Sequence, residues 1–294
     1  MRNKIINYEY VDPLENNVTL TCDEGGLLTI RPPSLFDKPY RITPGDVAIG
    51  VVGDAHGHLL NGLYQLDDWV NLTRRPLDFV VQTGDLTDES VNSSPSSSSY
   101  RGSDLTLGLR DLEEGSQKWS SLLSTTLNLR DKPIYFISGN HDVAELDRMF
   151  QSGALFGKNL EYLENGETVR WVDPENSGRS VKIGAIGWNY RTSDLSKIEE
   201  KRPDILISHS DIPLSGMSKE AAKYTFFGHH KDAISRSNPL ASTYGLEHLT
   251  KVGTPYRSGS CGVLYLNPSN GEGKFIHIPE KLSNVTVTEK ATAN

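Results

Sequence analysis

Five short apolar runs, each followed by a block of polar residues, constrain the fold of this chain more than any other feature. The runs are rich in β-branched and aromatic residues, which is typical of buried strands. In an open α/β sheet, ligands bind beyond the carboxyl ends of the strands, so the five runs predict one rim where polar side chains gather. The runs are 47–52, 78–82, 133–137, 205–207 and 224–227, and the blocks are 53–58, 84–88, 139–142, 208–209 and 228–230.

The residue types in these blocks are those of a metal site. Imidazole and carboxylate groups suit zinc, manganese and iron, whereas a thiolate site would need cysteines at ligand spacing. Cys22 and Cys261 are the only cysteines, and neither lies in such a pair. A carboxylate can bridge two cations, and two cations about 3.5–4 Å apart can hold a phosphoryl group and activate a water molecule. The sequence therefore predicts two bound metal ions (Mn, Fe or Zn).

Glycine precedes four of the polar residues, at 53, 84, 139 and 228. Glycine accepts backbone angles that other residues resist, so these positions are expected to form tight turns between strand and loop.

The polar blocks resemble the ordered signature of the calcineurin-like metallophosphoesterase superfamily over roughly residues 47–278. The matching motifs are D-A-H at 54–56, G-D-L-T-D at 84–88, G-N-H-D at 139–142 and a lone His209. The last motif of the family is G-H-x-H, and the segment Gly228-His229-His230-Lys231 departs from it because lysine stands at the second histidine position.

The resemblance implies an α/β fold in which two mixed sheets form a β-sandwich flanked by helices, with the active site at one edge. Periodicity alone indicates only the α/β class. A helix with a buried stripe is expected after residue 58, because Leu59, Leu63, Leu66 and Val70 recur at helical spacing.

The resemblance also implies a role for each motif residue. Asp54 and His56 would hold the first metal ion, Asp85 would bridge both ions, and Asn140, His209 and His229 would hold the second. A metal-bound hydroxide would be the nucleophile.

Two residues of the third motif would serve the chemistry instead of metal binding. His141 would protonate the leaving oxygen, and Asp142 would orient the His141 ring, as a carboxylate does for a catalytic imidazole.

Two arrangements remain open for the last motif. In the first, the turn is one residue shorter and His230 becomes the last ligand of the first metal ion. In the second, that ligand is absent, and the ion is held by Asp54, His56, Asp85 and water. The shortened turn is favoured slightly because a second histidine is still present.

Several other polar residues have a simpler explanation than function. Asp88 is expected to be structural or a helix cap, and His58 either forms local hydrogen bonds, the favoured interpretation, or lines the phosphate pocket. His248 and His277 are interpreted as surface or core histidines. Residues 188–191 follow a strand and form either an ordinary loop or a border of the site, with Arg191 on a phosphate.

The chain is expected to divide into three parts. Residues 1–46 form an N-terminal extension, in which 18–22 and 27–30 pair as a hairpin before a proline-rich connection. Residues 47–280 form the catalytic domain, which carries a serine-rich insertion at about 89–117 and a helix near 119–127. Residues 281–294 form a polar, flexible tail.

Composition narrows the possible partners. A formal net charge of −8 argues against a nucleic-acid binder, which would show a basic surface. No apolar stretch approaches the length of a membrane span, and mean hydropathy is −0.44. Without a secretory signal or a disulfide framework, the expected location is the cytoplasm. The oligomeric state does not follow from the sequence.

The function that fits these observations is hydrolysis of a small phosphomonoester or phosphodiester, such as a nucleotide. Asp88 is followed by Glu89 and Ser90, so the D-R-G sequence of the phosphoprotein phosphatase branch and its arginine are missing. A nuclease or a protein phosphatase of the same superfamily is an alternative. A degenerate phosphoesterase scaffold that binds partners is another.

Overall fold

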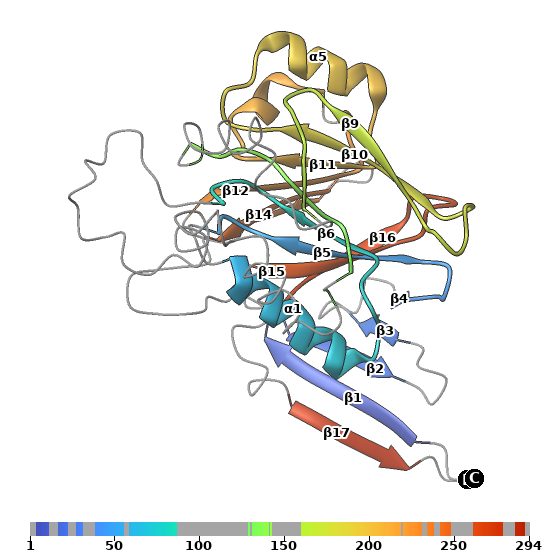
Figure 1. The fold of residues 1–294 in the computed structure, drawn as a ribbon. Helices are drawn as coiled ribbons and strands as arrows, with labels where there is room; N and C mark the ends of the chain where they lie inside the picture. Colours follow the sequence, from blue (N-terminus) through green and yellow to red (C-terminus); the bar gives the residue numbers. More distant parts are fainter. Residues whose placement is uncertain are drawn as a thin grey trace, which may run out of the picture.

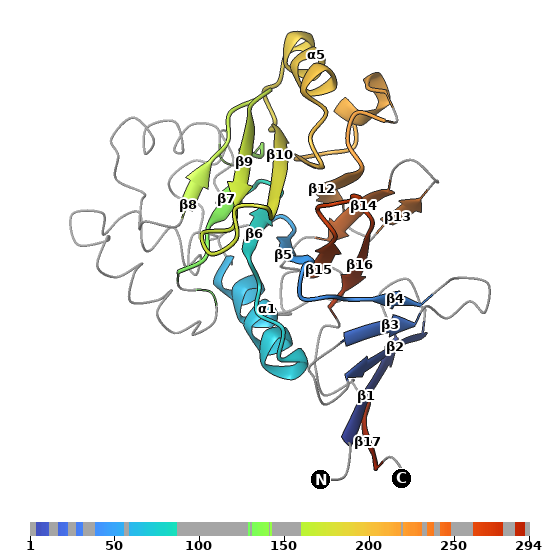
Figure 2. The ribbon, with the colours of Figure 1, turned by 90° about the vertical axis from the view of Figure 1, so that its right-hand side faces the viewer.

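The computed structural model covers the 294-residue chain and describes the following parts of it. They are residues 4–11, 17–22, 28–31, 39–55, 59–86, 129, 131–140, 142, 160–218, 220–230, 234–237, 242–247, 261–278 and 286–291. Two six-stranded sheets pack face to face, with helix α1 and a smaller sheet on one side and helix α5 on the other (Figures 1 and 2).

The central sheet carries the first three strands predicted from the sequence. Its order is β16 (Gly273–His277), β15 (Cys261–Leu266), β5 (Val47–Val52), β6 (Phe79–Gln82), β7 (Ile134–Phe136) and β8 (Leu160–Tyr162). Strands β5 to β8 run parallel, whereas β15 pairs antiparallel with both of its neighbours, β5 and β16. The carboxyl ends of β5, β6 and β7 therefore meet at one edge.

The outer sheet carries the other two predicted strands. Its order is β13 (Ile234–Ser237), β14 (Ser242–Glu247), β12 (Tyr224–His230), β11 (Ile205–Ser208), β10 (Ser180–Ile186) and β9 (Thr168–Val172). Strands β10, β11, β12 and β14 are parallel, and the two edge strands are antiparallel. The predicted sandwich of two mixed sheets is confirmed.

Side-chain alternation along β5 explains why the strand is apolar throughout. Val47, Ile49 and Val51 belong to the core between the two sheets, whereas Ala48 and Val52 belong to the core beneath the central sheet. Successive side chains of a strand point to opposite faces, so a strand covered on both faces has no polar side.

Helix α1 (Leu59–Thr73) packs on the outer face of the central sheet. The predicted stripe is confirmed, because Leu59, Leu63 and Leu66 are fully buried and Val70 is 5% exposed. Trp69 on the same helix donates a 3.2 Å hydrogen bond from Nε1 to the hydroxyl of Tyr265 in β15. No helix within the described parts of the chain has the length and apolarity needed to cross a membrane.

A third, antiparallel sheet contains strands from both ends of the chain. Its order is β17 (Thr286–Ala291), β1 (Lys4–Val11), β2 (Asn17–Cys22), β3 (Leu28–Arg31) and β4 (Tyr40–Arg41). Pairing of β2 with β3 agrees with the expected hairpin.

The flexible tail expected at 281–294 needs correction, because Thr286–Ala291 forms β17 and pairs with β1. Its polar composition concealed it. An edge strand has one partner and an exposed face, so it does not need an apolar run. Residues 286–288 are indeed exposed.

The outer face of the second sheet is covered by α5 (Thr192–Lys201), through buried Ile198, and by the short 3-10 helix η2 (Pro213–Gly216). Helix α5 has only two apolar residues, Leu195 and Ile198, on its inner face. Two residues are too few to form a helical pattern in the sequence, so this helix was not predicted. The serine-rich insertion at 89–117 and the helix expected at 119–127 lie outside the described residues.

Candidate metal centre

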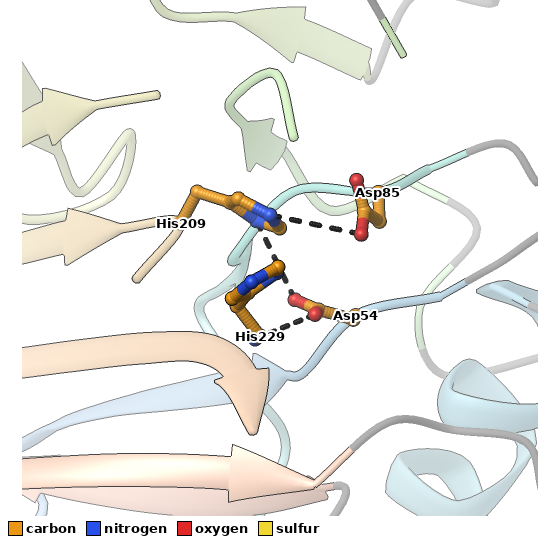
Figure 3. Close-up of side chains that lie close together, drawn as sticks. All are labelled: Asp54, Asp85, His209 and His229. Atoms are coloured by element: carbon orange, nitrogen blue, oxygen red, sulfur yellow. Dashed lines mark hydrogen bonds and ion pairs between the residues drawn. The ribbon is translucent and has the colours of Figure 1, made fainter. Parts of the chain in front are cut away.

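Four of the predicted ligands lie together where the two large sheets meet. Asp54 follows β5 and Asp85 follows β6 of the central sheet, while His209 follows β11 and His229 lies in β12 of the outer sheet (Figure 3). Each residue offers one ligand atom, and these atoms all lie within 4.8 Å of one another. The centre is therefore shared equally between the two sheets.

The imidazole of His209 lies between the two carboxylates (Figure 3). Its Nδ1 is 3.7 Å from Oδ1 of Asp54, and its Nε2 is 3.6 Å from Oδ2 of Asp85. Asn140, which follows β7, places its side-chain oxygen 2.8 Å from Nε2 of His209. Nδ1 of His209 also lies 3.1 Å from the carbonyl oxygen of Thr83. Asn140 is thus brought to the same cluster.

Burial makes this cluster electrostatically costly without a cation. Asp54 and Asp85 are fully buried, and His209 is 1% exposed. Burial, followed by the charge of Asp85, raises the pKa of Asp54 well above its ordinary range, although the amide of His229 and the hydroxyl of Thr83 oppose the shift. Two buried carboxylates side by side are stabilised by a positive charge between them. The donor set of two carboxylates, two imidazoles and an amide oxygen fits a divalent cation.

Two of the candidate ligands adopt left-handed backbone angles that are uncommon outside glycine. The φ angle is 49° at Asp85 and 59° at His229. Such conformations cost about 1–3 kcal/mol each and persist where the surroundings enforce them, often at functional sites. The backbone is therefore bent at the ligands themselves.

The glycines before the ligands serve two different needs. Gly84 has φ of 103°, as expected for a tight turn, and a Cβ there would lie 2.6 Å from Nδ1 of His209. Gly139 and Gly228 have no positive φ. A Cβ at Gly139 would collide with the carboxylate of Asp85, and one at Gly228 would collide with that of Asp54. At these two positions glycine provides space instead of an unusual angle.

Asp142 joins the loops that follow β6 and β7. Its Oδ2 accepts hydrogen bonds from the amides of Gly139, at 2.8 Å, and Leu86, at 3.0 Å, and the residue is fully buried. The sequence assigned Asp142 to orienting His141, which lies outside the described residues, so that role stays a prediction. The loop contacts are a second role that the sequence did not indicate.

Gln82, the last residue of β6, is a supporting residue that the sequence did not single out. Its Oε1 accepts the amide of Gly84 at 3.0 Å, and its Nε2 donates to the carbonyls of Gly53 and Gly84. These contacts hold the loops of Asp54 and Asp85 together. The available signal was an amide residue at the end of an otherwise apolar run.

The loop after β10 borders the cluster through Trp188. Its ring centroid is 5.7 Å from that of His209 and 5.5 Å from that of His229. Arg191, the other residue of interest in this loop, is exposed and begins α5, where its amide donates to Oδ2 of Asp194 at 2.9 Å. The border hypothesis therefore holds for Trp188, whereas Arg191 makes no contact with the cluster residues among the parts of the chain that the structure describes.

The last motif contains a β-bulge. Phe227 pairs with Gly245 of β14, whereas His230 pairs with Glu247, so three steps along β12 match two along β14. The expected spacing of two between the motif histidines assumes unbroken alternation, which the bulge interrupts. The His230 side chain lies outside the described part of the chain.

The remaining sequence-based candidates divide into two groups. His277 is a core histidine and not a surface one, because it is only 4% exposed and lies beside the ring of Phe275. His56, His58, Asp88, His141 and His248 lie outside the described residues.

Comparison with solved structures finds distant likenesses of fold. A structure titled as a novel archaeal phosphodiesterase is 13% identical, covers 79% of this chain and 99% of its own, and has a TM-score of 0.37. A structure titled as a novel phosphatase from Mycoplasma pneumoniae is 11% identical, covers 82% of this chain and 95% of its own, and has a TM-score of 0.46. A structure titled as GAP50, the anchor in the inner membrane complex of Plasmodium, is 12% identical, covers 80% of this chain and 89% of its own, and has a TM-score of 0.44. Likenesses at this level carry no argument about activity.

A match to a protein-family model identifies the family. No curated protein matches the sequence significantly. The model described as calcineurin-like phosphoesterase matches residues 47–248, which include every predicted ligand from Asp54 to His230. Because this match covers more than half of the chain, and the ligands that the structure describes converge at one edge of its sandwich, the protein belongs to the calcineurin-like phosphoesterase family.

Proposed function

We propose that this protein hydrolyses a small phosphomonoester or phosphodiester with two divalent or transition metal ions (Mn, Fe or Zn) at the cluster. The observation that carries the proposal is the convergence of Asp54, Asp85, His209 and His229, with ligand atoms within 4.8 Å of one another. In a dinuclear arrangement, His56 would complete the first ion and Asn140 the second. Asp85 would be the shared ligand.

Bound cations of this kind neutralise phosphoryl oxygens and lower the pKa of a water molecule toward neutrality. The protein's own part is to hold the ligands rigidly and to move a proton. The bent backbone at Asp85 and His229 and the Asp142 contacts fix the ligands before substrate arrives. His141 would donate the proton that the leaving oxygen requires.

A nucleotide is the substrate class that we favour among small phosphoesters, and the cytoplasm is the proposed location. A nuclease, a protein phosphatase and a partner-binding scaffold are the other outcomes that an assay must separate. The scaffold proposal is disfavoured by the buried carboxylate pair, because a binding surface gains nothing from that electrostatic cost.

The test is hydrolysis of p-nitrophenyl phosphate and bis(p-nitrophenyl) phosphate by the purified protein, before and after metal removal and manganese addition. We expect metal-dependent release of nitrophenolate, and the faster substrate distinguishes monoesterase from diesterase activity. Asp85→Asn should reduce turnover to near background and weaken metal binding while the far-ultraviolet circular dichroism stays unchanged. Asparagine tolerates the left-handed conformation of this position, so the change removes charge without adding strain.

Asp68→Asn is the matched control, because this aspartate lies on the exposed face of α1. It should keep full activity and full metal content. Wild-type protein that binds no metal and cleaves neither ester would overturn the proposal, as would an Asp85→Asn variant that retains turnover and two bound ions.

A further inference from the structure

We infer that Trp188 is a specificity-determining residue whose indole ring binds a flat aromatic group, such as a nucleobase, carried by the phosphoester. The inference rests on the proposed function, because it assigns the substrate class of that same centre. Four features of Trp188 support it: its position, its exposure, its fixed backbone and the chemistry of its ring.

The position of Trp188 is next to the metal ligands and outside them. Its ring meets that of His209 at 81° and that of His229 at 38°, with centroids 5.7 and 5.5 Å away. The two histidine rings contact each other at 5.0 Å. A group resting on Trp188 would therefore be one ring away from the residues proposed to hold the metal ions that bind the reacting phosphate.

The exposure of Trp188 is unusual for so large an apolar residue. Trp188 is 37% exposed, whereas Trp69 and Trp171 are buried. Within the described parts of the chain, the exposed large apolar residues are Val172, Trp188, Ile212 and Val287. Trp188 follows β10 and Ile212 follows β11, and these strands are parallel neighbours whose ends pair at Ile186 and Ser208. Both loops therefore leave the sheet at the edge where His209 lies.

The backbone of Trp188 is held in place on both sides of the sandwich. Its amide donates a 3.0 Å hydrogen bond to the carbonyl oxygen of Ser138, which directly precedes the Gly139–Asn140 motif. The preceding Gly187 donates its amide to Oδ1 of Asn165 at 2.5 Å. A Cβ at Gly187 would lie 2.6 Å from Oγ of Ser138, so the loop packs closely against the segment that precedes the Gly139–Asn140 motif. The exposed ring is thus anchored before any ligand binds.

An anchored and partly exposed indole favours one kind of ligand. Aromatic rings pack against other flat π-systems in offset or edge-to-face arrangements. Every nucleobase presents such a flat face, whichever base it is. The rival explanation is that Trp188 only braces the two histidine rings. In that case its removal would weaken metal binding and would affect all phosphoesters equally.

The test uses pairs of substrates that share their reacting bond and differ in the presence of a nucleobase. Adenosine 5′-monophosphate and ribose 5-phosphate are such a pair of monoesters. Thymidine 5′-(p-nitrophenyl) phosphate and methyl p-nitrophenyl phosphate are the corresponding diesters, with the same leaving group. Trp188→Leu should lower kcat/KM for the base-containing member by roughly tenfold or more, the size of one stacking contact, and leave the other nearly unchanged.

Two further variants serve as controls. Trp188→Phe keeps an aromatic face and should retain most of the discrimination. Val172→Ala removes an exposed apolar residue at the opposite end of the sheet, since Val172 pairs with Ser180 at the start of β10. It should change nothing. Equal loss on both members of a pair, together with reduced manganese content, would overturn the inference in favour of the bracing role.

A binding measurement, made by fluorescence on mixing, separates failure of this inference from failure of the proposed function. Adenosine 5′-monophosphate added to the manganese-loaded protein should quench tryptophan fluorescence, and ribose 5-phosphate should not. The Trp188→Phe variant should lose that quenching. Wild-type protein that hydrolyses esters but binds both compounds equally would contradict the role of Trp188 and leave the hydrolase assignment standing. Base-dependent quenching without hydrolysis would support Trp188 and contradict the hydrolase.

Discussion

The backbone amide of His229 donates a 2.5 Å hydrogen bond to Oδ2 of Asp54, a residue 175 positions earlier in the chain. Asp54 follows a strand of the central sheet, and His229 belongs to the outer sheet, so the bond crosses the sandwich at the metal centre. The left-handed conformation of His229 accompanies this arrangement. One ligand is therefore oriented by the backbone of another.

This relationship predicts that Gly228→Ala will damage the centre although no candidate ligand is replaced. The new Cβ would collide with the Asp54 carboxylate and with Oγ1 of Thr83, which forces Asp54 from its position. We expect metal affinity to fall by roughly 10- to 100-fold, as for loss of a residue that supports a ligand. Isothermal titration with manganese measures it.

The control for this change is Gly216→Ala, where the nearest atom to an added Cβ is Cδ1 of Leu195 at an ordinary 3.8 Å. Its metal affinity should equal that of the wild type. If the Gly228→Ala variant bound manganese as tightly as the wild type, the position of Asp54 would not depend on its close contact with residues 228 and 229.

Substitutions of Asp142 and His141 should impair different properties of the protein. Asp142→Ala removes the acceptor of two amides, those of Gly139 and Leu86, and an unsatisfied buried amide costs roughly 1–3 kcal/mol. We expect a lower free energy of unfolding and weaker metal binding. His141→Ala should lower kcat by roughly 10²–10⁴-fold with metal content unchanged, because its proposed task is proton donation.

Denaturant unfolding and metal analysis separate the two variants. The His141→Ala defect should also shrink for esters with acidic leaving groups, which need no proton. An Asp142→Ala variant that lost only rate would argue that its carboxylate acts through His141 alone.

The last motif can be resolved by metal counting. If His230 is the final ligand of the first ion, His230→Ala should remove one metal equivalent and Lys231→His should do little. If that ligand is absent, His230→Ala should be silent and Lys231→His should tighten the first ion. We favour the first result, and stoichiometry at limiting manganese decides between them.

His277 predicts a loss of stability in mild acid. Burial in the core lowers the pKa of this imidazole from 6.5 to about 4. The unfolded chain takes up the proton near pH 6.5 and the folded protein only near pH 4, so stability falls as the pH is lowered through that window. Between pH 7.5 and pH 5 the loss amounts to about 2 kcal/mol.

The comparison variant is His277→Leu, which does not titrate. Denaturant unfolding of metal-free wild type and variant should show the wild type losing about 2 kcal/mol more over that range. Parallel losses in the two proteins would mean that His277 is accessible to protons in the folded state.

Much of the sandwich could be predicted because its signals are local. The apolar runs ending before Asp54, Asp85 and His209 became β5, β6 and β11, and the leucine stripe became α1. A strand covered on both faces or a helix covered on one face leaves a pattern within a few residues. The rule for parallel strands then placed two candidate ligands, Asp54 and Asp85, at one edge of the central sheet.

The features that escaped prediction depend on contacts between distant segments. The amides of Gly139 and Leu86 meet Asp142 only because β6 and β7 are neighbours. The polar strand β17 is recognisable only beside β1. The bulge before His230 likewise depends on β14, which no pattern in the motif itself reveals.

The pairing of β1 with β17 joins two strands that are synthesised at widely separated times. Lys4 pairs with Ala291, so the partner on one side of β1 is synthesised last among the described strands. At about 5–20 residues per second, that partner arrives roughly a quarter of a minute to a minute later. A strand edge left open that long is a template for pairing with another nascent chain. During translation, β1 therefore exposes a strand edge to such pairing until β17 covers it and becomes the polar edge strand of the sheet.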